Sequence, residues 1–264
     1  MSGSERRERI VSELVERRHL TAQQLSAEIG VSEATVRRDL KQLDAEGKVE
    51  LNYGSATIRR LSDFSFQSKV NRNTAGKQII GRLAADLIAD GDQVFLDSGT
   101  TSFAVAPHLK RKRGLSVIVH SARLALELDA PGLSVILLGG QYRAERMDTV
   151  GPLTASALNQ LHGYICMIGA DGLRMDVGLF AADIESADLY RRAVGNARET
   201  ILLVDHTKFL APALYKIVEW DAISRVVTDQ QPPPEWEEFF QRKQIQLICE
   251  ASPQPAGEPH HQGV

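Results

Sequence analysis

The 264-residue sequence lacks the features that mark several classes of protein. It has only two cysteines, Cys166 and Cys249, and both lie in short apolar segments, so we expect buried, reduced thiols. No apolar run approaches the ~18 residues that a membrane-spanning helix needs. The segment Met1–Arg7 contains no apolar signal-peptide core. These absences predict a cytoplasmic protein that does not enter the membrane, and the length predicts about two domains.

The charge shows no excess of one sign that would mark a nucleic-acid binder. The net charge is −3. Residues 1–60 carry 11 Lys and Arg against 10 Asp and Glu, and the rest of the chain carries 20 against 24. DNA-binding domains commonly present a basic patch on one face. Only the placement of the charges can therefore show whether the chain binds DNA.

Residues 1–58 have the pattern of three helices and a hairpin. Apolar spacing predicts a helix over 5–18. The segment 21–24 (Thr-Ala-Gln-Gln) has the spacing of a capping box, and the helix after it should end at Gly30. Ser32 can cap a third helix from Glu33 to about Glu46, which Gly47 would end. Residues 48–51 and 55–58 alternate around Asn-Tyr-Gly, which predicts a β-hairpin.

The second and third helices have the form of a helix-turn-helix, because a short turn with Gly joins them. If Val36, Leu40 and Leu43 are buried, the opposite face of the third helix carries small and basic residues, namely Ala34, Thr35, Arg37, Arg38, Lys41 and Ala45. Small residues allow close approach to a DNA groove, and Arg can bind guanine or phosphate. A solvated helix with surface arginines can present the same face, so the pattern alone leaves both interpretations open.

After an aperiodic linker over 59–76, apolar segments alternate with helical patterns. We predict strands at 94–96, 115–119, 133–138, 164–168, 201–204 and 245–249, and helices at 77–89, 122–128, 153–161 and 184–198. Such alternation predicts an α/β domain with a largely parallel sheet that is covered on both faces. Residues 251–264 are rich in proline and aperiodic, and we expect them to be disordered.

A hydroxyl-rich loop follows the first predicted strand of this domain. In the segment Asp97–Thr101, Gly99 allows backbone to approach a ligand, and Ser98, Thr100 and Thr101 offer hydroxyl donors before a helical segment. This composition predicts a phosphate site. An ordinary strand-to-helix turn with a Thr cap remains the alternative, and the sequence contains neither the Gly-rich ATP-binding loop nor the dinucleotide-binding motif.

Polar residues follow other predicted strands as well. Gly139-Gly140 leads to Arg143, Asp171 lies between glycines, and Lys208 follows Asp205. Ligands of open α/β sheets bind beyond the carboxyl ends of the strands, so we expect these residues to converge. A hydroxyl loop with Lys suits a phosphate and carboxylates suit sugar hydroxyls, which together predict a phosphorylated sugar.

Two sets of motifs resemble one known family. The segment Val31–Leu40 (VSEATVRRDL), followed by 43–47 (LDAEG), resembles the winged helix-turn-helix of DeoR/GlpR-type bacterial transcriptional regulators. Segments of the later chain resemble the sensor domain of that family, in the same order: Gly91-Asp92, Asp97–Thr101, Leu138–Gly140, Val150–Pro152, Gly169–Gly172 and Asp205–Phe209. The resemblance implies a winged helix-turn-helix over 1–58, a linker over 59–76, an α/β sensor domain over 77–250 similar to the ribose-5-phosphate isomerase fold, and a tail over 251–264.

The resemblance also implies a function. It implies a DNA-binding repressor of carbohydrate metabolism, not an enzyme, whose operator binding is controlled by a phosphorylated sugar. The implied DNA contacts are Thr21, Ser32, Ala34, Thr35, Arg37, Arg38, Lys41 and Arg59. The implied effector contacts are Lys77, Asp97, Ser98, Gly99, Thr100, Thr101, Gly140, Arg143, Asp171 and Lys208. The expected partners are operator DNA, the sugar effector and further copies of the chain in a dimer or tetramer; no cofactor and no metal are expected.

The predicted wing departs from the family pattern. Leu51, Tyr53 and Ser55 stand where an Arg, a His and a second Gly are usual, so Arg59 and Arg60 are expected to take over the phosphate contact.

One alternative function is a sugar-phosphate isomerase or transferase with an added DNA-binding module. Asp97, Asp171 and Lys208 could then perform acid–base chemistry. No Glu or Cys lies in a recognisable nucleophile or base motif, and the histidines form no zinc-binding pattern, so the sequence favours a regulator.

Overall fold

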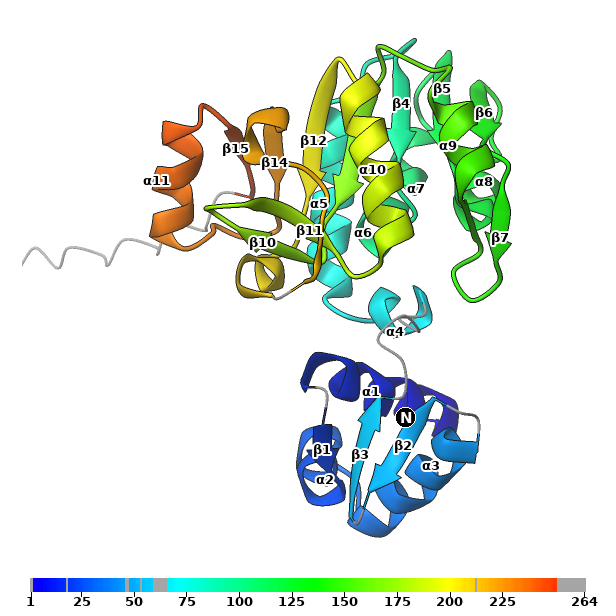
Figure 1. Cartoon of the computed structure of the whole chain (residues 1–264), viewed down its shortest axis with the longest axis vertical. Helices are drawn as coiled ribbons and strands as arrows, with labels where there is room; N and C mark the ends of the chain where they lie inside the picture. Colours follow the sequence, from blue (N-terminus) through cyan, green and yellow to red (C-terminus); the bar gives the residue numbers. More distant parts are fainter. Residues whose placement is uncertain are drawn as a thin grey trace, which may run out of the picture.

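The computed structural model describes residues 2–17, 19–45, 48–52, 54–58, 66–211 and 213–250. Figure 1 shows a small N-terminal module and a larger α/β module, with helix α4 (Phe66–Val70) between them. Among the described residues we find no helix with the length and apolar content that crossing a bilayer requires.

The N-terminal module consists of three helices and a small antiparallel sheet. Its elements are α1 (Gly3–Arg17), β1 (His19–Thr21), α2 (Ala22–Ile29), α3 (Glu33–Ala45), β2 (Val49–Asn52) and β3 (Ser55–Ile58), and the strand order is β1-β3-β2. The predicted capping box is present, since Thr21 N donates to Gln24 Oε1 at 2.9 Å and Gln24 N donates to Thr21 Oγ1 at 3.1 Å. Gly30 ends α2 in the left-handed conformation, with φ 76°. The three predicted helices and the hairpin are therefore confirmed, and β1 is a strand that the sequence pattern did not predict.

The hydrophobic core of this module is formed by apolar side chains of α1, α2, α3 and the small sheet. Val36, Leu40 and Leu43 are buried as predicted, and Arg38 and Lys41 are exposed. Asp39 is also buried, which the sequence pattern did not predict, and it accepts a hydrogen bond from Arg6 Nε at 2.5 Å. Because burying a carboxylate is costly unless it is paired, this contact ties α1 to α3.

The larger module is built on a parallel sheet. Seven of the described strands form it in the order β15-β14-β12-β9-β4-β5-β6. They are β4 (Gln93–Leu96), β5 (Leu115–Val119), β6 (Leu133–Leu137), β9 (Ile165–Gly169), β12 (Glu199–Leu203), β14 (Arg225–Val227) and β15 (Gln246–Ile248). The parallel sheet is confirmed, and the short β14 is the one member that the apolar runs did not predict. Both cysteines are free thiols; Cys166 on β9 is buried, whereas Cys249, after the edge strand β15, is only partly buried.

Helices cover both faces of this sheet. One face carries α5 (Thr74–Asp86), α6 (Thr100–Phe103), α7 (Ala106–Leu109) and α8 (Ala122–Glu127), and the other carries α9 (Pro152–Leu158), α10 (Ile184–Asn196) and α11 (Pro234–Arg242). Side chains alternate between the two cores, so that Val94 and Leu96 face α5 whereas Phe95 faces α10. The remaining elements are β7 (Gln141–Arg143), β8 (Asp148–Val150), β10 (Gly172–Arg174), β11 (Gly178–Ala181), β13 (Tyr215–Lys216), and the 3₁₀ helices η1 (His206–Leu210) and η2 (Trp220–Ala222).

The segment expected to be a linker contains regular structure at its end. Helix α4 lies within it, and α5 begins at Thr74 rather than at Lys77, because Asn73 Oδ1 accepts the Gly76 N–H at 3.2 Å and caps the helix. Several expectations fall outside the described residues and stay predictions, namely those on Glu46, Gly47, Tyr53, Arg59, Arg60, the linker over 59–65 and the tail over 251–264.

Gly81 allows α5 to lie against the backbone between α6 and α7. A Cβ at this position would lie 2.2 Å from Ala104 O. We therefore predict that Gly81→Ala lowers the free energy of unfolding by about 1–3 kcal/mol, measured by chemical denaturation. Gly195→Ala in α10 is the control, since nothing lies within 4 Å of its added Cβ, and we expect it to be neutral or stabilising. Equal stability of the two variants would contradict the close contact.

Candidate functional site

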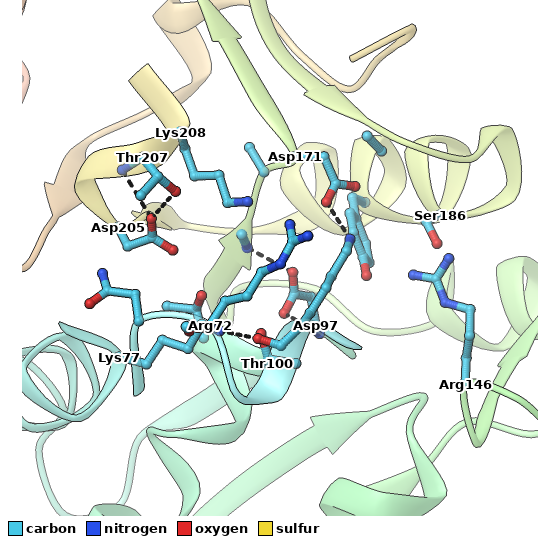
Figure 2. A pocket seen from close by; sticks show the side chains of 18 residues that line it. Arg72, Lys77, Asp97, Thr100, Arg146, Asp171, Ser186, Asp205, Thr207 and Lys208 are labelled. Carbon is cyan, nitrogen blue, oxygen red and sulfur yellow. Dashed lines mark hydrogen bonds and ion pairs between the residues drawn. The ribbon is translucent and has the colours of Figure 1, made fainter. Parts of the chain in front are cut away.

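A cavity opens where the strand order of the large sheet reverses. Strands β5 and β6 extend the sheet on one side of β4, whereas β9 and β12 extend it on the other. Loops at the carboxyl ends of strands on either side of such a point diverge and leave room for a ligand. A cavity of about 270 Å³ occupies this position (Figure 2). Its lining residues are Lys69, Arg72, Asn73, Lys77, Asp97, Gly99, Thr100, Thr101, Arg146, Gly169, Ala170, Asp171, Ala181, Ser186, Tyr190, Asp205, Thr207 and Lys208.

Most of the predicted effector residues line this cavity. They are Lys77, Asp97, Gly99, Thr100, Thr101, Asp171 and Lys208. Figure 2 shows Asp205, Thr207 and Lys208 on one side of it and Arg146 with Ser186 on the other. The loops after β4, β9 and β12 thus meet as the sequence predicted.

Ser98, Gly140 and Arg143 do not line the cavity. The Ser98 side chain is buried below the loop, and its Oγ donates to Asp148 Oδ2 at 3.0 Å. A Cβ on Gly140 would lie 1.9 Å from Thr154 Oγ1, so this glycine permits close packing.

Arg143 holds neighbouring elements together instead. Its Nε and Nη2 donate to the two carboxylate oxygens of the fully buried Asp148, both at 2.8 Å, and its Nη1 donates to Asp183 Oδ1 at 2.9 Å. Bidentate pairing of this kind fixes the guanidinium in place. Arg143, like Ser98 and Gly140, therefore supports the walls of the cavity from outside it.

The three carboxylates of the cavity hold backbone groups. Asp97 Oδ1 accepts the Gly99 N–H at 3.0 Å, and its Oδ2 accepts the Gly169 N–H at 2.7 Å. Asp205 Oδ1 accepts the Thr207 N–H at 3.0 Å and caps η1. Asp171 Oδ2 accepts the Ala182 N–H at 2.8 Å. These bonds shape the loops of the cavity.

Lysine and arginine side chains outnumber carboxylates among the residues that line the cavity. Lys77 is 5% exposed, and burial lowers its pKa to about 8. Burial likewise lowers the pKa of Lys208, and the nearby charge of Lys69 contributes to the shift. Burial alone would raise the pKa of Asp171, but the charge of Lys69, which donates to Asp171 Oδ1 at 2.5 Å, holds that pKa below its usual range. An anion in this cavity would relieve the repulsion between the cations.

Several lining residues were missed by sequence reasoning. Lys69, Arg72 and Asn73 come from the segment expected to be a linker, where no periodicity marks a functional element. Arg146 lies in a loop beside Asp183, to which it donates a hydrogen bond. The polar run 71–73 directly before α5 is a local signal that could have marked Arg72 and Asn73.

The predicted DNA-contact residues lie at the surface of the N-terminal module. Ser32, Ala34, Arg37, Arg38 and Lys41 are exposed, and Thr35 is partly exposed. The hydroxyls of Ser32 and Thr35 lie 2.9 Å apart at the start of α3, and Arg37 Nη2 donates to Glu33 Oε2 at 2.9 Å. Thr21 is engaged in the cap of α2. The described part of the chain contains no group of three or more His, Cys, Asp or Glu side chains arranged to hold a metal ion.

Comparison with known families matches both modules. Residues 6–69 match the DeoR-like helix-turn-helix domain, and residues 72–230 match the DeoR C terminal sensor domain. The chain belongs to the DeoR family. This membership makes it a DNA-binding transcriptional regulator and not an enzyme.

Similar proteins include named repressors that match almost end to end. The HTH-type transcriptional repressor GlcR of Bacillus subtilis is 30% identical over 94% of this chain and 96% of its own length. The putative aga operon transcriptional repressor of Escherichia coli O157:H7 is 29% identical over 93% of each chain. The glycerol-3-phosphate regulon repressor of Escherichia coli K12 is 26% identical over 94% of this chain and all of its own length. Among solved structures, ribose 5-phosphate isomerase from Plasmodium falciparum is 15% identical, covers 51% of this chain and 52% of its own, and gives a TM-score of 0.38.

The lowered pKa of Lys77 predicts how anion binding depends on pH. An anion binds the protonated lysine better, so affinity should fall as pH rises through about 8. Sulfate is a suitable probe because its charge stays constant over this range. We expect weaker sulfate binding at pH 9 than at pH 7 by calorimetry, with proton uptake on binding near pH 8. In Lys77→Met this dependence should be smaller, and an equal dependence in both proteins would contradict the assignment.

Proposed function

We propose that this chain is a repressor of genes of carbohydrate metabolism, and that a phosphorylated sugar bound in the cavity controls its affinity for operator DNA. The observation that carries the proposal is the presence, in one chain, of a helix-turn-helix with a basic exposed face and a cation-rich cavity at the switch point of the sensor sheet.

The chemistry of the cavity supports a phosphorylated sugar. Lys208 and Arg72 offer charged donors, and Thr100 and Thr101 offer hydroxyls, which together suit a phosphate group. Carboxylate oxygens such as those of Asp171 can accept hydrogen bonds from sugar hydroxyls. The volume of about 270 Å³ fits a small molecule. A relative named as the glycerol-3-phosphate regulon repressor is in accord with a phosphorylated effector.

Operator binding by this chain should involve several copies. One winged module makes few DNA contacts, and specific binding by helix-turn-helix proteins uses dimers on repeated half-sites. We therefore propose a dimer or tetramer. Since a repressor must share a compartment with its operator, this function also accords with a cytoplasmic location.

Arg38 provides the test of the DNA interface. We predict that Arg38→Ala weakens binding about 5- to 150-fold, because one base or phosphate contact is lost, while the melting temperature stays unchanged because the side chain is exposed. Binding is measured by fluorescence anisotropy on a duplex that the full chain selects from a random library. The control is Arg174→Ala, an exposed arginine of the sensor module. Equal affinity of both variants would remove Arg38 from the interface.

A panel of phosphorylated sugars and their unphosphorylated counterparts tests the effector. We expect that one or more phosphorylated members raise the melting temperature of the full chain and change its operator affinity, without turnover. Lys208→Met should abolish this response and retain ligand-free operator binding, because Lys208 lies in the cavity and not in the DNA-binding module. Isomerisation of a panel member would contradict a purely regulatory role for the cavity.

A further inference from the structure

Helix α4 and residues 71–73, here called the bridging segment (66–73), contact the DNA-binding module. Asn71 Nδ2 donates to Glu8 Oε2 of α1 at 3.2 Å. The guanidinium of Arg72 donates to both the side-chain and the backbone oxygen of Ser12, also on α1. The segment therefore holds the first helix of the winged module through directional polar contacts.

The same segment contacts the sensor module. Lys69 Nζ donates to Asp171 Oδ1 at 2.5 Å in the wall of the cavity, and Asn73 Nδ2 donates to Asp229 Oδ2 at 2.8 Å. The buried Phe66 ring packs edge-on against Phe103 with 5.3 Å between ring centroids. Lys69, Arg72 and Asn73 also line the cavity, and Figure 2 shows Arg72 among the lining side chains. Arg72 is thus both a cavity residue and a contact of α1.

One buried amine fixes the shape of the bridging segment. Lys77 Nζ donates to the backbone oxygen of Arg72 at 2.6 Å and to that of Lys69. Asn73 adopts the left-handed conformation, with φ 44°, which non-glycine residues seldom adopt. The backbone that carries Lys69 and Arg72 is therefore held as one unit, so a shift of this backbone moves both side chains together.

We propose that Lys69 and Arg72 are effector-binding residues, and that an anion in the cavity draws them away from Asp171 and from α1. This inference rests on the proposed function. Arg72 donates to two oxygens of Ser12, and phosphate or sulfate in the cavity offers it a charged, bidentate acceptor. Lys69 can leave the carboxylate of Asp171 and bind the anion instead, since Lys77 and Lys208 also attract an anion into this cavity.

Helix α1 contacts α3, the helix that carries the predicted DNA contacts. Arg6 of α1 donates to the buried Asp39 of α3 at 2.5 Å. Release of α1 from the bridging segment therefore changes the support of the helix that carries Arg38. The ligand acts by binding one arrangement of these contacts better than the other, which is what coupling between two sites requires.

The test compares two ion pairs of similar exposure in the full chain. Lys69→Met breaks the pair with Asp171, and Lys110→Met breaks the control pair with Glu127, whose atoms lie 2.6 Å apart outside the cavity. Hydrogen exchange of α1 and affinity for the selected operator are measured with and without inorganic sulfate. In the wild type and in Lys110→Met, sulfate should increase exchange in α1 and change operator affinity at least about fivefold.

Lys69→Met should differ from both. Without sulfate it should already show the increased exchange and the altered affinity, and sulfate should add little. Lys69→Arg should behave as the wild type, which separates loss of the charge from misfolding, and Arg72→Met should bind sulfate more weakly. The proposal is overturned if folded Lys69→Met keeps the wild-type exchange, affinity and sulfate response, or if sulfate leaves α1 of the wild type unchanged.

Failure of the proposed function has a different signature. If no phosphorylated sugar alters operator affinity of the wild type, the effector assignment fails. The ligand-free comparison of Lys69→Met with Lys110→Met still decides whether the ion pair controls α1.

Discussion

The cavity of the larger module depends on the two hydrogen bonds that Asp97 accepts. Its carboxylate joins the Gly99 N–H, after β4, to the Gly169 N–H, after β9, across the point where the strand order reverses. The side chain is 2% exposed, so these bonds form away from competing water. They set the width between two loops that would otherwise diverge, and the hydroxyls of Thr100 and Thr101 take their positions from this junction. Asp97 therefore builds the cavity rather than serving only as one of its polar groups.

The net charge of −3 gives no indication of how the charges are arranged. Two buried carboxylates are neutralised by guanidinium groups that donate hydrogen bonds to them. Arg6 donates to Asp39, and Arg143 donates to both oxygens of Asp148. Lys77 and Lys208, in contrast, lie close enough to other cations that burial and repulsion together lower their pKa values. Lysine and arginine side chains thus outnumber carboxylates in the cavity lining, five to three, and basic side chains also gather on the exposed face of α3.

Sequence reasoning succeeded where local periodicity fixes the outcome. The apolar stripe of α3 and the apolar pattern of the central strands correctly predicted which side chains are buried, and parallel topology brought Thr100, Asp171 and Lys208 to one edge. In the edge strand β6, however, Ile136 and Leu137 are exposed despite the same apolar pattern. It failed where a side-chain direction depends on tertiary packing. Ser98 turns inward because Asp148 and Tyr190 offer partners there. Lys69 and Arg72 line the cavity because Phe66 of α4 packs against Phe103 and brings this segment to it. No periodic pattern in the sequence predicts this tertiary contact.

Coupling between the cavity and the DNA-binding module can be measured through thermodynamic linkage. If an effector changes operator affinity, operator DNA must change effector affinity by the same factor. The most direct measurement is the affinity of the full chain for an active phosphorylated sugar, determined by calorimetry with and without saturating operator. The account predicts that the ratio of these two affinities equals the ratio of operator affinities measured with and without the sugar. Equal sugar affinity in the presence and absence of operator would contradict it.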